Sequence, residues 1–102
     1  MFLVQLLLPV YDNDGRPIEP GQFTQVRKDL TNRFGGVTAY LRAPAKGLWK
    51  RRDATVDDDD VVMVEVEVEV FDREWWRSYR RELERAFKQD TILIRAIKLE
   101  PM

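Results

Sequence analysis

The chain of 102 residues contains no cysteine and no histidine. These absences exclude disulfide bonds, thiolate nucleophiles, cysteine- or histidine-based zinc sites and every catalytic triad that uses histidine. Ser78 is the single serine. The sequence also lacks the G-x-x-x-x-G-K-[ST] loop and the G-x-G-x-x-G fingerprint, which argues against nucleotide hydrolysis and dinucleotide-dependent redox chemistry. We therefore expect no cofactor and no metal site.

Excess charge of one sign and long apolar runs are absent as well. Seventeen basic residues stand against eighteen acidic ones, a net charge of -1 that is not typical of a nucleic-acid-binding protein. The apolar segment 1–10 is shorter than the roughly 20 residues of a membrane span. It also lacks the basic region and cleavage site of a signal peptide. We expect a cytoplasmic protein with no nucleic-acid partner and no membrane partner.

The residues that are present are typical of one globular domain spanning 1–102, because 44% are hydrophobic and 34% are charged. The hydrophobic periodicity and the positions of turn residues predict six elements in the order β-α-β-β-α-β. This order predicts an α+β, ferredoxin-like sandwich, in which two helices cover one face of a four-stranded antiparallel sheet with strand order 4-1-3-2. The predicted strands span 2–10, 37–42, 61–71 and 91–99, and the helices run from Pro20 to Gly35 and from Asp72 to Asp90.

The segment 61–71 alternates valine with glutamate, which is the period of a strand with two different faces. We expect the valines to face the helices and three glutamates to line the open face of the sheet. Together with polar residues of the other strands they form a candidate ligand-binding set on that face: Gln5, Tyr40, Arg42, Glu65, Glu67, Glu69 and Arg95.

Two interpretations of this polar face lead to different functions. In the first, the face is an ion-paired surface that meets solvent or a second subunit. In the second, a cofactor-independent enzyme of the isomerase or oxygenase type uses Glu67 as general base, Tyr40 as hydrogen-bond donor and Arg42 or Arg95 as a carboxylate clamp. We favour the first.

Apolar residues on the same face indicate a homodimer. Leu3 and Leu7 are expected to point to the open side with nothing to cover them, and Leu93 or Ile97 add to that surface. Stacking a second copy on this sheet buries those side chains. The expected function is a small dimeric module that binds a small ligand or a protein partner. A third hypothesis is an amino-acid-sensing regulatory domain, with the ligand at the loop 12–21, where the first helix begins.

Four other clusters have a structural explanation that we prefer to a functional one. The aspartates 57–60 are expected to form a solvated turn rather than a cation site. The basic residues 50–52 beside Trp49 are expected to be a charged loop rather than a nucleic-acid contact. The aromatic stripe of the second helix (Trp75, Trp76, Tyr79 and Phe87) is expected to pack in the core. Its arginine-rich side is expected to face solvent, with an acidic partner as the alternative.

Three short motifs occur in order along the chain: Gly36-Val37-Thr38, Gly47-Leu48-Trp49 and Phe87-Lys88-Gln89. In this order they resemble motifs of small uncharacterised bacterial proteins with a ferredoxin-like βαββαβ fold. The similarity spans roughly residues 2–97. The resemblance implies the fold and assigns no catalytic residues, and the alternation of valine and glutamate departs from the pattern.

Overall fold

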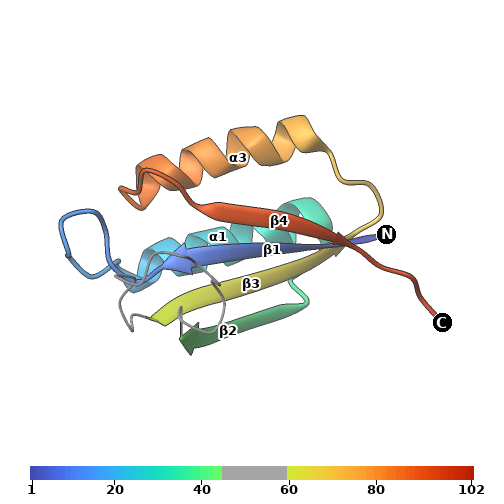
Figure 1. Cartoon of the computed structure of the whole chain (residues 1–102), viewed down its shortest axis with the longest axis horizontal. Helices are drawn as coiled ribbons and strands as arrows, with labels where there is room; N and C mark the ends of the chain where they lie inside the picture. Colours follow the sequence, from blue (N-terminus) through green and yellow to red (C-terminus); the bar gives the residue numbers. More distant parts are fainter. Residues whose placement is uncertain (45–59) are drawn as a thin grey trace, which may run out of the picture.

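The computed structural model describes residues 1–44 and 60–102 of the chain (Figure 1). The elements follow one another in the predicted β-α-β-β-α-β order of an α+β, ferredoxin-like fold. They are β1 (Phe2–Pro9), α1 (Pro20–Phe34), β2 (Ala39–Pro44), β3 (Asp60–Val68), α3 (Arg73–Ala86) and β4 (Leu93–Lys98).

The four strands form one antiparallel sheet in the order β2-β3-β1-β4, as predicted. β1 pairs with β3 from Phe2 opposite Val68 to Pro9 opposite Val61, and with β4 on its other side. In this central position the side chains of β3 and β4 lie beside those of β1 on each face, and the residues from Val4 to Leu8 are all buried.

Both helices lie on one side of the sheet (Figure 1), and the core fills the space between the two layers. The predicted valine row of β3 faces this core, and every second residue of β1 joins it. The buried side chains of the cluster come from β1, α1, β3, α3 and the segment that joins α3 to β4. They are Val4, Leu6, Leu8, Val26, Leu30, Val62, Val64, Val66, Val68, Trp76, Tyr79, Leu83, Phe87 and Ile92. The expectation that the aromatic stripe of α3 packs in the core is therefore confirmed for Trp76, Tyr79 and Phe87, and Trp75 is half-buried.

Local signals determine where the helices begin and end. Gly35 ends α1 in the left-handed conformation, with φ of 86°, and its N–H donates to Thr31 O at 2.8 Å. The carboxylate of Asp72 caps α3 by accepting from Trp75 N at 3.2 Å. The preceding Phe71 stacks on Trp76, with ring centroids 6.3 Å apart.

β3 is shorter than predicted. Val68 is the last residue of β3, and it lies opposite Phe2 of β1. The segment predicted to continue the strand to Phe71 leaves the sheet there, and Asp72 then caps α3. Val70, on the departing segment, is 76% exposed.

Candidate functional site

A row of hydrogen-bonded polar side chains crosses the open face of the sheet, which is the face away from the helices. Gln5 on β1 lies opposite Glu65 on β3 and opposite Arg95 on β4. Gln5 Nε2 donates to Glu65 Oε2 at 2.6 Å, and Arg95 Nε donates to Gln5 Oε1 at 2.6 Å. The prediction that these three residues share one face is confirmed, and the structure adds that they contact one another.

The next row along the same face is mixed in character. Leu3 lies between Glu67 on β3 and Ile97 on β4. Glu67 is exposed, and the exposed fraction of Ile97 is 43%. Glu69 lies beyond the end of β3, so the predicted ridge of three glutamates contains only two within the strand.

Leu7 differs from its prediction. It lies on the open face, yet it is only 1% exposed, so the expectation that it is uncovered is wrong. Apolar Met63 and Leu93 lie opposite it on the two neighbouring strands. The exposed apolar surface of this face is therefore found at the other end, near Leu3 and Ile97.

Tyr40 and Arg42 do not share a face with Glu67, and this prediction is wrong. Tyr40 lies opposite Val64 and Arg42 lies opposite Val62, and both valines belong to the core face. Residues paired across two strands point to the same side of a sheet. A shift of one residue in register reverses the face of every side chain. The proposed enzyme site of base, donor and Arg42 clamp is thus not assembled.

Tyr40 and Arg42 instead line an apolar recess beside the loop that enters α1. Its volume is about 370 Å³, within the range typical of small-molecule sites. The recess brings two sets of predicted candidates together, because the loop 12–21 contributes to the same wall as β2. The lining residues are Val10, Tyr11, Pro17, Ile18, Pro20, Phe23, Tyr40, Arg42 and Val62.

The hydroxyl of Tyr40 is a hydrogen-bond donor in this recess. Burial raises its pKa above the ordinary value of 10.0 and outweighs the lowering effect of the Arg27 charge. The guanidinium of Arg27 lies over the ring, 4.7 Å from its centroid. Tyr40 is therefore neutral at physiological pH, with its ring held from one side.

The loop at the mouth of the recess is held by its own hydrogen bonds. Asp12 Oδ1 accepts from Asp14 N at 2.8 Å and from Arg16 N at 2.9 Å. The hydrogen bond from Arg16 is the largest cause of the lowered pKa of the Asp12 carboxyl. Gln89 Nε2, from the third sequence motif, donates to Tyr11 O at 2.7 Å. The wall of the recess is thus preformed, as binding sites usually are.

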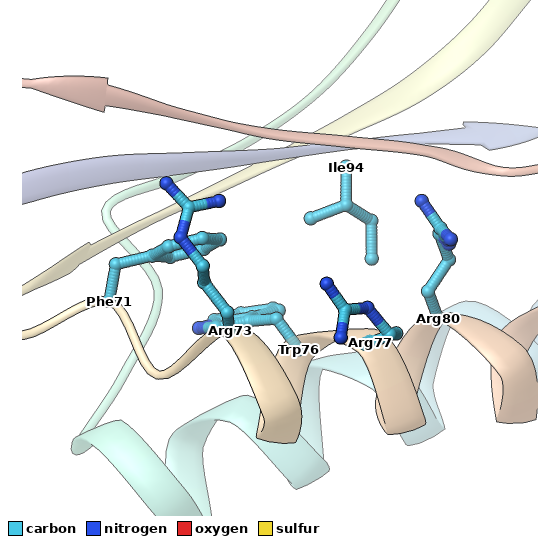
Figure 2. Close-up of a pocket in the computed structure, with 6 residues that line it drawn as sticks. All are labelled: Phe71, Arg73, Trp76, Arg77, Arg80 and Ile94. Atoms are coloured by element: carbon cyan, nitrogen blue, oxygen red, sulfur yellow. The ribbon is translucent and has the colours of Figure 1, made fainter.

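A second recess lies between α3 and β4, and our sequence reasoning did not single it out. Its volume is about 140 Å³. Figure 2 shows Arg73 and Arg80 reaching from α3 toward the sheet on both sides of Ile94, with Arg77 between them. The spacing of four and three residues was the available signal, because it places all three arginines along one side of a helix. Arg73 and Arg77 are exposed, as expected for this side of the helix, and the structure adds that they line a recess together with half-buried Arg80.

Three features of the sequence fall on residues 45–59, outside the part of the chain that the structure describes. They are the Gly47-Leu48-Trp49 motif, the basic residues 50–52 and the aspartates 57–59. Within the described ranges 1–44 and 60–102, no three acidic side chains lie together as a metal site would require. In the same ranges, α1 and α3 are both too short or too polar to cross a membrane.

Comparison with known proteins gives no relative for this chain: no family model, no curated protein and no solved structure matches it. The resemblance to small bacterial proteins of this fold therefore stays a prediction. Any functional conclusion rests on the geometry of the open face and of the two recesses.

Proposed function

We propose that this chain is a small binding module that pairs with a second copy of itself through the open sheet face. The observation that supports the pairing is the self-complementary pattern of that face. Exposed Ile97 and half-buried Leu3 lie beside the charged row of Glu65, Gln5 and Arg95. No helix of the described residues lies over this face (Figure 1).

The two signs of charge on the face are carried by different strands. Glu65 and Glu67 lie on β3 and Arg95 lies on β4, with β1 between them. A two-fold axis parallel to the strands sets β3 of one copy against β4 of the other, so opposite charges meet on both sides of the axis. A two-fold axis across the strands sets β3 against β3 and brings like charges together. The charge pattern therefore favours the parallel axis.

Mass in solution tests the pairing. Light scattering after size-exclusion chromatography, over a dilution series, should give a particle of twice the 12.1 kDa chain mass. Ile97→Lys should shift the particle to the monomer, because it places a charge in the apolar part of the interface. Val70→Lys is the matched control, since Val70 is exposed and lies outside the sheet. A monomeric wild type, or a dimer that survives Ile97→Lys, would contradict the proposal.

Charge exchange tests the orientation of the two copies. Glu65 and Arg95 both pair with Gln5, so they lie at the same level along the strands and face each other across the proposed axis. Arg95→Glu sets two glutamates against each other, and Glu65→Arg sets two arginines against each other, so each variant alone should dimerise weakly. Mixing the two variants should restore a heterodimer, because each glutamate at this level then meets an arginine. If the mixture pairs no better than either variant, the parallel two-fold axis is wrong.

A second function is favoured by the recess at Tyr40, which fits a small and mainly apolar ligand with an acidic group. Its wall is apolar, and Tyr40 and Arg42 supply the polar groups at one side. Benzoate is a suitable probe, with benzyl alcohol as the uncharged control. In two-dimensional NMR, benzoate should shift the amide signals of Ile18, Phe23 and Val62. Arg42→Gln should weaken benzoate and leave benzyl alcohol unchanged. Shifts confined to other parts of the chain would exclude this recess as the site.

A further inference from the structure

The recess between α3 and β4 gathers three positive charges around an apolar floor. Arg73, Arg77 and Arg80 come from successive turns of α3, and Ile94 comes from the edge strand β4. In Figure 2 the three arginine side chains lie around the space next to Ile94. Arg73 and Arg77 remain exposed, so like charges gather at a recess that a ligand can reach from solvent.

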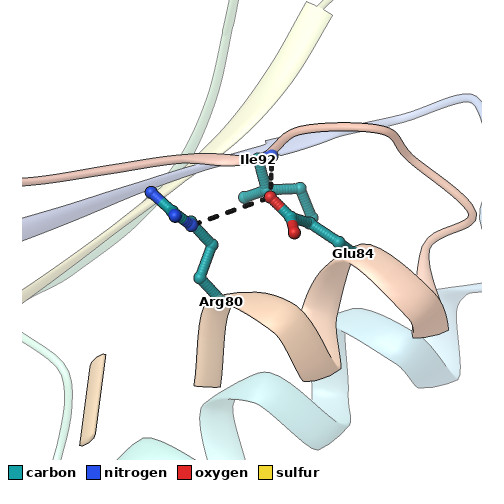
Figure 3. Close-up of polar contacts among 3 residues, drawn as sticks. All are labelled: Arg80, Glu84 and Ile92. Atoms are coloured by element: carbon teal, nitrogen blue, oxygen red, sulfur yellow. Dashed lines mark hydrogen bonds and ion pairs between the residues drawn. The ribbon is translucent and has the colours of Figure 1, made fainter. Parts of the chain in front are cut away.

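Little within the described chain neutralises these arginines. Among the residues that the structure describes, no acidic side chain lines the recess. Glu84 is the one carboxylate that forms an ion pair with them among the described residues, with its Oε2 3.7 Å from Arg80 Nε. The same oxygen also accepts from Ile92 N at 3.0 Å (Figure 3). Glu84 therefore forms an ion pair with the guanidinium of Arg80 beside the start of β4, and among the described residues Arg73 and Arg77 have no ion pair.

α3 ends at Ala86, earlier than the predicted end at Asp90. Lys88, four residues after Glu84, has a φ of 51°, so the two residues are not on one helical face. Glu84 turns instead toward Arg80 and Ile92. These contacts of Glu84 hold Arg80 beside the recess.

The walls of the recess are held in place by the core. Phe71 stacks on Trp76, which is only 3% exposed, and the guanidinium of Arg73 lies 5.4 Å from the centroid of Phe71. Asp72, between Phe71 and Arg73, caps α3 and so has a structural role. The floor is thus preformed, and the arginine heads are the adjustable part.

Size and charge together define the ligand. A volume of about 140 Å³ is several times the share of a water molecule, about 30 Å³. It is below the range of about 300–1,000 Å³ that holds drug-sized molecules. One compact group therefore fits, and three guanidinium groups call for more than one negative charge. Arginine forks match the oxygen atoms of phosphate in pairs.

From these contacts we infer that the recess formed by Arg73, Arg77, Arg80, Phe71, Trp76 and Ile94 binds the phosphate group of a small phosphorylated molecule. The group enters between the arginine heads, with its oxygens accepting from the guanidinium N–H groups. The part of the molecule attached to the phosphate leaves the recess past Phe71 and Ile94, two of the apolar side chains that line it. This site is separate from the open sheet face, since Ile94 points to the helix side.

Titration of the full chain with inorganic phosphate, followed by calorimetry and by NMR of the α3 amides, tests the site. Arg77→Gln removes a central guanidinium that is exposed and lies outside the core, and it should raise the Kd for phosphate by about ten-fold or more. Arg81→Gln is the matched control, because it removes the same charge from the same helix outside the recess. It should change the Kd by no more than about two-fold.

Several results would overturn the inference. Equal weakening by Arg77→Gln and Arg81→Gln would mean that the general positive field of α3, and not a site, attracts the anion. Acetate binding as tightly as phosphate would exclude a preference for the doubly charged group. No saturable phosphate binding by the wild type would reject the site outright. Arg73→Gln is the second variant, and thermal unfolding of both variants confirms that each one is folded before its affinity is compared.

Phenyl phosphate extends the test to the attached group. If Phe71 and Ile94 contact the organic part of the ligand, phenyl phosphate should bind more tightly than inorganic phosphate. Phosphoserine, which carries a charged and polar group instead, should then bind no more tightly than inorganic phosphate. The reverse order would assign the phosphate to a peptide and would overturn the inference of a small phosphorylated molecule.

Discussion

Gln5 and Glu65 are 60 residues apart in the sequence, and the Gln5 amide donates to the Glu65 carboxylate at 2.6 Å. The carbonyl oxygen of the same amide accepts from Arg95 Nε at 2.6 Å. Only one orientation of the amide satisfies both neighbours, because the carboxylate accepts and the guanidinium donates. Gln5 is only 9% exposed, so water does not readily replace either bond.

Replacing Gln5 by methionine should destabilise the domain. Methionine has nearly the same shape, but it leaves Glu65 and Arg95 without the partner between them. We expect the free energy of unfolding to fall by about 1 to 3 kcal/mol, measured by urea denaturation. A double-mutant cycle with Arg95→Met should show a coupling energy of at least about 0.5 kcal/mol. Additive effects would mean that the Gln5–Arg95 hydrogen bond contributes nothing to stability.

The hydrogen bond between the two helices predicts a dependence on alkaline pH. Tyr79 Oη donates to Asp29 Oδ2 at 3.0 Å. Burial, and then the negative charge of Asp29, raise the pKa of Tyr79 well above its ordinary value of 10.0. A raised pKa stabilises the fold while the hydroxyl is protonated. That contribution is complete below pH 10 and is lost as the pH rises above it.

Tyr79→Phe checks this behaviour. At neutral pH the variant should be less stable by about 1 to 2 kcal/mol, because Asp29 loses a partly buried donor. As the pH rises above 10.0, the difference between the wild type and the variant should shrink. A difference that stays constant up to strongly alkaline pH would show that Tyr79 titrates alike in the folded and unfolded chains.

Two glycines at opposite ends of α1 should respond to alanine with opposite signs. A Cβ at either position meets nothing within 4 Å, so only the backbone conformation decides. Gly35 has a φ of 86°, where a side chain costs about 1 to 2 kcal/mol. Gly21 lies in the first turn of α1, where alanine should stabilise by about 0.5 kcal/mol. Thermal unfolding of the two variants gives the comparison, and equal effects would contradict the assigned helix boundaries.

Val66 and Val70 are a matched pair that tests where β3 ends. Val66 is 1% exposed in the core and Val70 is 76% exposed beyond the strand. Val66→Ala should cost about 2 kcal/mol from the buried methyl groups and the resulting cavity. Val70→Ala should change stability by no more than about 0.5 kcal/mol. A large effect of Val70→Ala would mean that β3 continues to Phe71, as the alternation of the sequence predicted.

The two central strands were predictable because burial gives them strong patterns. The alternation in β3 assigns its valines to the core, and this fixes the faces of β1 through the pairing of Val4 with Val66. β2 carries a weaker pattern, since Tyr40 and Arg42 alternate with Ala39 and Leu41. The polar members were expected on the open face. At the edge of a sheet, however, a side chain on the helix side is only partly covered, and the polar tips of Tyr40 and Arg42 still reach solvent.

One candidate site was predictable from the sequence and another was not. Gln5, Glu65 and Arg95 were found from the sequence because each lies on a strand whose face was already known. The arginine recess was missed because Arg73, Arg77 and Arg80 satisfy the pattern of a solvated helix side equally well. Their convergence depends on how close α3 lies to Ile94 of β4, and no pattern within α3 contains that distance.

The amino-acid sequence by itself determined the order of the six elements, the end of α1, the start of α3, the central valine row and the absence of cysteine and histidine chemistry. These properties follow from local periodicity, caps and composition, each of which acts over a few residues. Only the tertiary structure decided the face of Tyr40, the burial of Leu7 and the gathering of three arginines beside one isoleucine. Those properties depend on the register of an edge strand and on the packing of a helix against it, which join residues far apart in the chain.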